Sequence, residues 1–385
     1  MKKLTLILLA VLSIQLSFAQ ISTDKTAKKD SLTLHGQLGL TLGVGNIESP
    51  IYHVNGRYIP ELVYKRSFTN DKSFDLKLSL QFNSSSWHTD VHSTNDMSLN
   101  FYRARARYKT KTVDIKAGLQ ELELGSSKIF RRLQWFNLTS LTDPQRIAEG
   151  NFGLSTRFTL SDKSNILIWG LTDDDGFTST DFSPRPKDII NSGIRISQDV
   201  NKGAIALSYN YAGIKINDPS WLRTRNRVHK FGLEGKWDLG IDLWLEMEHV
   251  INNYPQFMMF HETAINPGIG HMFEIGNGLD VAFEHLFQWH FTNDQELVSN
   301  IHQQSSALRL SYPFGSRNKI SLLSTYNWTD EKSYNTINLQ HNFNKLSLHL
   351  IANLNAAQPA YGLNLPFQSS YSNGPGFQIM AIYKH

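Results

Sequence analysis

The feature that most constrains this chain is an alternation of apolar and polar side chains that repeats every two residues along most of its length. The longest example covers 279–291, where Leu, Val, Phe, His, Phe, Trp and Phe occupy every second position. Successive side chains of a β-strand point to opposite faces, so this period predicts strands with one apolar and one polar face. Helical periodicity is not convincing after the N-terminal segment, with the stretch 121–150 left open. The sequence therefore predicts an all-β protein.

Marking every alternating segment predicts about eighteen strands, with sixteen as the smaller alternative. The expected strand cores are 31–44, 54–68, 74–82, 97–108, 113–120, 152–160, 165–171, 189–197, 204–212, 227–238, 241–250, 269–276, 279–291, 301–312, 319–328, 335–343, 346–354 and 376–384.

The connections between these segments alternate between short and long. Short ones include 109–112, 239–240 and 344–345, and the long ones include 83–96, 121–151, 172–188, 213–226, 251–268, 292–300 and 355–375. Outer-membrane barrels have short periplasmic turns and longer external loops. A β-sandwich has no reason to sort its loops in this way, and the repeat of about 40–50 residues expected of a propeller is not found. The sequence therefore predicts a transmembrane, antiparallel, up-and-down β-barrel.

The composition agrees with a barrel that has one face in lipid. Mean hydropathy is −0.33 and charged residues make up only 19%, yet aromatic residues reach 11%. Beyond the N-terminus no apolar run reaches the ~18 residues that a membrane helix needs, which excludes a polytopic helical protein. The chain has no cysteine, which excludes disulfides, thiolate metal sites and cysteine nucleophiles.

The N-terminus predicts export from the cytoplasm. A short basic region, Met1–Lys3, precedes the apolar run 4–14, and Ser17–Ala19 has the small-x-small form of a cleavage site. We expect 1–19 to be a signal peptide, 20–30 a periplasmic leader and 31–385 the transmembrane barrel. Loss of Lys2 and Lys3 would lower the net charge from +4 to +2. Nucleic acid is therefore not expected as a partner.

A run of alternating arginines is the clearest functional feature. Arg103, Arg105 and Arg107 share one face of a predicted strand, and each would cost about 2–4 kcal/mol on the lipid face near the bilayer centre. They are therefore expected to face the lumen. Lys116 and Arg157 lie on the polar faces of the next two strands, so the five residues predict a basic, pore-lining wall.

An acidic wall is expected on the opposite side of the barrel. Its members lie on the polar faces of the tenth to thirteenth predicted strands: Glu234, Asp242, Glu246, Glu248, Glu274, Asp280 and Glu284. In a closed barrel of about eighteen strands, this wall would face the arginines. We hypothesise an electric field across the lumen that orients dipolar solutes. The alternative is that these charges only solvate a polar interior.

The segment Gly118-Leu119-Gln120-Glu121-Leu122-Glu123-Leu124-Gly125, with the strand and loop rhythm, resembles the porins and alginate-export-type channels of Gram-negative outer membranes. The chain departs from that family at Leu119, where Arg is usual, and at Lys384-His385, which follow the last aromatic residue. The resemblance implies that loop 121–151 folds inward and narrows the pore. The candidate constriction residues are Glu121, Glu123, Arg131, Arg132, Trp135, Asp143 and Arg146.

The same loop has other interpretations. Its charges and adjacent aromatic residues are suited to binding a sugar, by stacking of a ring on the pyranose face. Alternatively, it is an external lid without a ligand.

Catalytic and metal-binding patterns are weak. The sequence contains no G-x-S-x-G, H-E-x-x-H or P-loop motif. His88-x-Asp90-x-His92 lacks an identifiable third metal ligand, and the run 173–176 with Asp181 lacks the spacing of a calcium loop. We therefore predict no catalytic residue, no metal and no cofactor.

The expected function is passive diffusion of small polar or anionic solutes through the outer membrane of a Gram-negative bacterium. Outer-membrane lipid, lipopolysaccharide and a small polar solute or saccharide are the expected partners, and a homo-oligomer is left open. The alternative functions are a barrel for polysaccharide binding, export or capsule assembly and, as a third candidate, an outer-membrane esterase.

Overall fold

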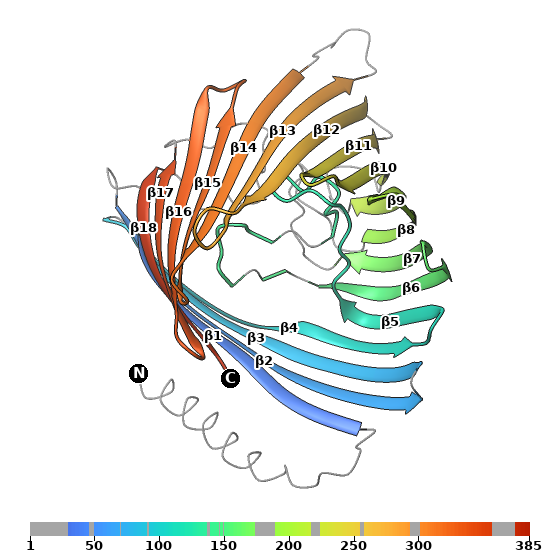
Figure 1. The fold of residues 1–385 in the computed structure, drawn as a ribbon, viewed down its shortest axis with the longest axis horizontal. Helices are drawn as coiled ribbons and strands as arrows, with labels where there is room; N and C mark the ends of the chain where they lie inside the picture. The colour runs from blue at the N-terminus through green and yellow to red at the C-terminus, as the bar shows by residue number, and fades with distance from the viewer. Residues whose placement is uncertain are drawn as a thin grey trace.

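The protein is described by a computed structural model that covers residues 30–45, 50–69, 71–90, 92–136, 139–145, 147–148, 150–173, 189–216, 224–254, 258–292, 301–355 and 374–385. Its strands form one antiparallel, 18-stranded sheet in which each strand pairs with its neighbours in the sequence. Pairing of β1 with β18 closes the sheet into a barrel, with Leu40 opposite Ala381. Figure 1 shows the strands arranged as the wall around a central space. The predicted barrel and its strand count are confirmed.

The strands have the following bounds: β1 Asp30–Gly45, β2 Ile51–Thr69, β3 Lys72–His88, β4 Ser93–Lys109, β5 Val113–Gln120, β6 Asn151–Ser161, β7 Ser164–Asp173, β8 Ile189–Val200, β9 Gly203–Ile216, β10 Thr224–Asp238, β11 Asp242–Tyr254, β12 Met258–Phe273, β13 Leu279–Thr292, β14 Ile301–Phe314, β15 Asn318–Asn327, β16 Lys332–Asn342, β17 Leu346–Asn355 and β18 Pro375–Lys384.

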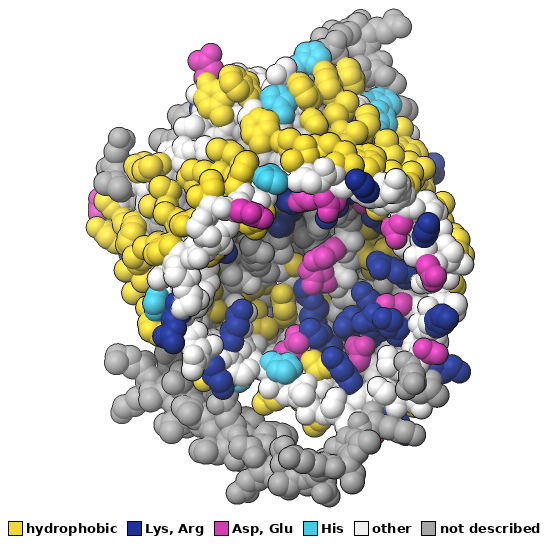
Figure 2. Space-filling view, in the orientation of Figure 1, with side chains coloured by type: hydrophobic (Ala, Val, Ile, Leu, Met, Phe, Trp, Pro, Cys, Tyr) yellow, Lys and Arg dark blue, Asp and Glu magenta, His cyan; other side chains and the backbone are white. Residues whose placement is uncertain are grey.

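The two faces of each strand lie in different surroundings, as the alternation predicts. On β9, Leu207 is 61% exposed on the outside, whereas the neighbouring Ala206 and Ser208 are buried inside the barrel. Figure 2 shows apolar side chains over the outer surface and charged side chains around the hollow interior. So much exposed apolar surface requires a lipid cover. No helix in the described ranges is long and apolar enough to cross a membrane.

Several strands are longer than the sequence predicts, and β3, β4 and β12 are clear examples. β12 begins at Met258, so most of the expected loop 251–268 is strand. β3 continues to His88 and β4 begins at Ser93, so most of the expected loop 83–96 is strand as well. In β12 the outward positions include His261 and Thr263, and Pro267 interrupts the pattern. The end of β3 is the polar run Asn83–Ser86. Strand segments that extend beyond the lipid need no apolar face, so their sequences do not show the alternation.

The apolar core lies inside the barrel, where loop 121–150 packs on the wall. Two parts of the loop, 122–124 and 133–136, pack on β7. The resulting cluster contains Leu122, Leu124, Leu133, Trp135, Phe136, Leu167, Trp169 and Leu171. Between them, Ile129 and Phe130 pack on the inward faces of β11–β16. The wall carries small side chains in this second contact, namely Ala264, Ala282 and Ala307. These alanines leave space for the loop to approach the sheet.

Candidate functional site: a lumen crossed by an inward loop

The loop enters the lumen from the middle of the barrel wall, because β5 ends early at Gln120. This side chain is fully buried, and its Nε2 donates to the carbonyls of Lys116 at 3.2 Å and Gly153 at 3.0 Å. At the other end of the loop, Asn151 Nδ2 donates to the carbonyl of Phe136 at 3.0 Å. One buried amide thus fixes the strand end from which the loop departs, and a second ties the middle of the loop to the wall. The inward fold expected for this loop is present in the described residues.

Glu284 on β13 is the main attachment point of the loop. Its carboxylate is fully buried and accepts hydrogen bonds from the backbone N–H groups of residues 128, 129 and 130 at 2.6–2.9 Å. Ser127 Oγ, Trp244 Nε1 and Asn266 Nδ2 donate to the same carboxylate at 2.9–3.1 Å. Successive backbone N–H groups that converge in this way form an anion-binding nest. Here the anion is a side chain of the barrel wall.

Glu246 on β11 binds the preceding part of the loop. Its Oε1 accepts hydrogen bonds from the N–H groups of Ser126 and Ser127, both at 2.7 Å. Gly125 has φ +87°, and a Cβ there would lie only 2.4 Å from Oε1 of Glu246. Any larger residue would be strained and would push this carboxylate away. The glycine is therefore required by the close approach of the loop to the wall.

Glu248 on β11 binds the next part of the loop, around Arg132 and Trp135. It accepts a hydrogen bond from Trp135 Nε1 at 2.8 Å and pairs with Arg132 at 2.7 Å. Arg132 also pairs with Glu262 on β12. Burial alone would lower the pKa of Arg132, but the two nearby carboxylates together outweigh it and raise this pKa above its usual value. Trp135 is only 3% exposed, so its ring is unavailable for the sugar stacking that the sequence suggested.

The other acidic residues have different surroundings. Asp242 pairs with Lys128 of the loop at 2.8 Å. Glu234 pairs with Arg195 on β8, and Asp280 pairs with Arg309 on β14 at 3.0 Å. Glu274 lies just beyond β12, exposed in the turn that leads to β13. The prediction that Glu274 lines the lumen is therefore wrong, because it lies in a turn. The other members of the acidic wall face inward on β10–β13, but much of this wall binds the loop or neighbouring arginines.

The basic wall lies on β4–β6, as expected, and its arginines also have partners. Arg103 is 4% exposed and donates to Glu121 at 3.0 Å and to the carbonyl of Ala148 at 2.9 Å. Arg105 pairs with Asp75 at 3.3 Å. Arg107 donates to both carboxylate oxygens of Asp114, at 2.6 and 2.7 Å.

A cavity of about 400 Å³ lies between this wall and the start of the loop. Lys116 and Arg157 line it beside the three arginines, as do Glu121 and Glu123. Burial, and then the proximity of Glu121, raise the pKa of Glu123 above its usual value. The charges of the basic wall thus border this cavity, and cations outnumber carboxylates along it.

The remaining constriction residues hold the far part of the loop. Arg131 donates to the carbonyl of Thr139 at 3.3 Å, and Asp143 pairs with Arg57 on β2 at 3.2 Å. Arg146 lies outside the described residues. Arg57 and Asp143 also line a smaller cavity of about 180 Å³.

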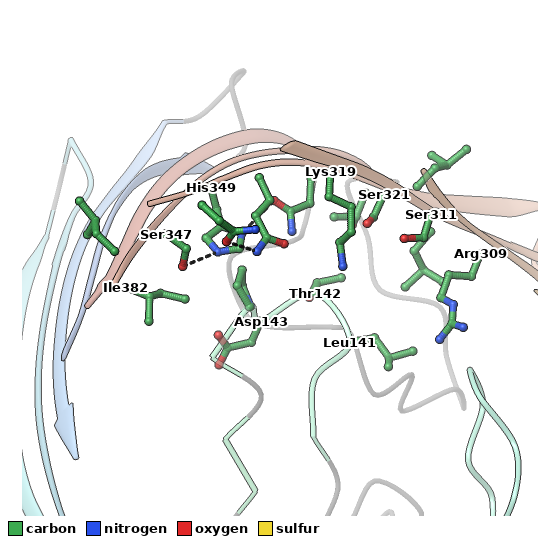
Figure 3. Close-up of a pocket in the computed structure, with 18 of the residues that line it drawn as sticks. Leu141, Thr142, Asp143, Arg309, Ser311, Lys319, Ser321, Ser347, His349 and Ile382 are labelled. Atoms are coloured by element: carbon green, nitrogen blue, oxygen red, sulfur yellow. Dashed lines mark hydrogen bonds between the residues drawn. The ribbon is translucent and has the colours of Figure 1, made fainter. Parts of the chain in front are cut away.

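A cavity of about 840 Å³ was not predicted from the sequence. It lies between Leu141–Pro144 of the loop and the inward faces of β14–β17 (Figure 3). Its wall is rich in uncharged polar side chains, such as Ser311, Ser321 and Asn338. Serine and asparagine at alternating positions are visible in the sequence, but searching for charged residues overlooks them.

The weak metal-binding patterns gain no support from the structure. Across the described ranges, no group of three or more His, Asp or Glu side chains is placed to hold a metal ion. Residues 174–176 and Asp181 of the second pattern lie outside those ranges.

Solved outer-membrane porins have a similar fold. OccK7 (OpdD) of Pseudomonas aeruginosa is 13% identical over 94% of this chain and 99% of its own, with a TM-score of 0.55. The anion-selective porin from Comamonas acidovorans is 11% identical over 92% of this chain and 100% of its own, with a TM-score of 0.52. OmpF of Salmonella typhi, solved with daunomycin, is 11% identical over 93% of this chain and 98% of its own, with a TM-score of 0.52.

Comparison with protein-family models and with curated proteins found no match. The resemblance to alginate-export-type channels therefore stays a prediction. The solved structures support the porin part of the resemblance at the level of the fold. The chain has the closed, antiparallel, all-β barrel fold of Gram-negative outer-membrane porins.

Proposed function

We propose that the protein is an outer-membrane channel through which small polar or anionic solutes diffuse passively. The observation that carries this proposal is a closed barrel whose lumen is crossed by a fixed loop with polar cavities beside it. A loop fixed inside the lumen would narrow the path, and the cavities beside it are the space that we propose for a solute. Selection would then depend on the shape and charge of the remaining space.

The basic wall is proposed to favour anions in the cavity beside β4–β6. Lys116 and Arg157 line this cavity together with the three arginines. Arg105 and Arg107 pair with Asp75 and Asp114, which lowers the net charge of the wall. We therefore expect moderate rather than strong anion selectivity.

The outward face is proposed to contact outer-membrane lipid and lipopolysaccharide, because its apolar side chains require a cover. The oligomeric state is a separate question, which mass measurement of the protein in detergent would answer.

Conductance in a planar bilayer tests the channel. The purified protein should give stable current steps, and a KCl gradient should give a reversal potential that indicates a moderate preference for anions. Replacing Lys116 and Arg157 by Gln should reduce that preference and leave the steps intact. A silent protein would favour the alternative of a polysaccharide-binding or assembly barrel, and hydrolysis of a soluble ester would favour the esterase.

A further inference from the structure

One wall of the 840 Å³ cavity carries uncharged polar side chains that lie side by side on neighbouring strands. Ser311 lies opposite Ser321, which in turn lies opposite Asn338, across β14, β15 and β16. Residues directly opposite one another in antiparallel strands point to the same face, so these three side chains form a row. A second row places Gln340 opposite His349 on β17.

Some of the charged groups beside this row are paired with groups of opposite charge. Arg309 pairs with Asp280 at 3.0 Å, and Asp143 pairs with Arg57 at 3.2 Å. Lys319 stands opposite Gln340 within the wall, and Lys345 and Lys384 lie at the end of the cavity near the turns. Apart from Lys319, the middle of the wall therefore offers mainly hydroxyl and amide groups.

The side of the cavity that faces this wall is partly apolar. Figure 3 shows Leu141, Thr142 and Asp143 of the loop opposite the strands that carry Lys319, Ser321 and His349. Leu141 and Pro144 line the cavity together with Thr142. The cavity thus has a polar wall with many hydrogen-bonding groups and a less polar surface across from it.

We propose that this cavity is a subsite for a neutral saccharide, an inference that rests on the proposed channel function and names a class of solute for it. Sugar hydroxyls both donate and accept, and so do serine and asparagine side chains. The C–H faces of the sugar would lie against Leu141 and Pro144. The cavity volume falls in the range of about 300–1,000 Å³ found for small-molecule sites. An apolar solute would leave the polar groups of the wall without partners.

Binding and conductance of maltotriose test this proposal together. Isothermal titration calorimetry on the detergent-solubilised protein should detect maltotriose, and the sugar should reduce the bilayer current. The double variant Ser321→Ala and Asn338→Ala removes two groups of the row. We expect binding about tenfold weaker, because each lost hydrogen bond lowers affinity by a few fold. The unblocked current should remain.

The chain offers a matched control on the same two strands. Ser324 and Asn335 are hydrogen-bonded to each other at 2.6 Å and lie in the outward-facing rows of β15 and β16. Replacing both by Ala changes the same residue types outside the lumen. Maltotriose binding by this control should equal that of the unaltered protein.

The two proposals fail in different ways. Current without maltotriose binding would overturn the subsite and leave the channel standing. Binding without current would overturn the channel and support the subsite. Tighter binding of glucuronate than of maltotriose would also overturn the subsite, since it would show recognition through the lysines. Equal loss of binding in the inward and outward double variants would do the same.

Discussion

At the scale of single residues, the buried carboxylates of the acidic wall serve mainly to hold the loop. Glu284 accepts six hydrogen bonds, three of them from consecutive backbone N–H groups. A buried carboxylate is stable when its oxygens are fully bonded, and loss of such a group leaves its donors unsatisfied. The position of the loop therefore depends on a few wall residues.

Replacing Glu284 by Ala should release the loop from β13. Leaving its buried donors without an acceptor should cost about 3–5 kcal/mol of attachment energy. We expect larger and noisier current steps in bilayers, and protease cleavage within 126–133 in detergent, while the barrel itself stays folded. The matched control is Glu274→Ala, which removes an exposed carboxylate in a turn. Unchanged current and unchanged cleavage in E284A would contradict this role.

The pKa of Glu123 predicts a pH dependence of selectivity. Burial and Glu121 raise this pKa, so Glu123 takes up its proton at a higher pH than an ordinary glutamate. As the pH falls through the raised pKa, the cavity beside the arginines loses a negative charge and anion selectivity should increase. Reversal potentials between pH 7 and pH 4 measure this change.

The Glu123→Gln variant provides the control for this titration. It should have the higher anion selectivity already at pH 7 and a smaller change on acidification. A variant with the same pH profile as the unaltered protein would assign the titration to another group.

At the scale of strands, the outward rows determine whether each segment is stable in lipid. Leu207 on β9 is 61% exposed and lies opposite Leu233 and Ile196, so it stands in a fully apolar surface. Replacing it by Arg should destabilise the barrel by about 2–4 kcal/mol, as charges on the lipid face do near the bilayer centre. Urea unfolding in lipid vesicles measures this loss.

The matched substitution is Leu239→Arg. Leu239 is 54% exposed and lies in the short turn between β10 and β11, where water solvates a new charge. It should leave stability nearly unchanged. Equal effects at the two positions would argue against lipid contact at Leu207.

Strand lengths show where prediction from the sequence is weakest. The alternation locates every strand that crosses the apolar band, since lipid on one side requires it. It fails for the first part of β12, where His261 and Thr263 stand on the outward face, and for the outer ends of β3 and β4, which carry polar residues on both faces. Hydrogen bonding to the neighbouring strand, rather than contact with lipid, extends these segments.

At the scale of the whole molecule, the even number of strands places the start of β1 and the end of β18 at the same end of the barrel. The N–H of Gly36 donates to the carbonyl of His385 at 3.1 Å at this end, which also carries the short turns. We expect this end to face the periplasm.

Labelling of introduced cysteines tests this orientation, and the cysteine-free sequence gives no background. Asp90→Cys, in the turn between β3 and β4, should react with a membrane-impermeant maleimide on intact cells. Lys345→Cys, in the turn between β16 and β17, should react only after lysis. The reverse pattern would mean that the barrel is inserted the other way.

The sequence by itself indicated a barrel of about eighteen strands and, in the segments that cross the apolar band, the face on which each residue lies. These follow from the alternation, because each strand must satisfy lipid on one side and water on the other. It also indicated that 121–151 folds inward, through a family resemblance. Only the tertiary structure decided what the inward charges contact. Glu284 and Lys128 are 156 residues apart, and no local period encodes such a contact. The polar wall of the 840 Å³ cavity likewise depends on the closure of the barrel, which brings β14–β17 opposite the loop.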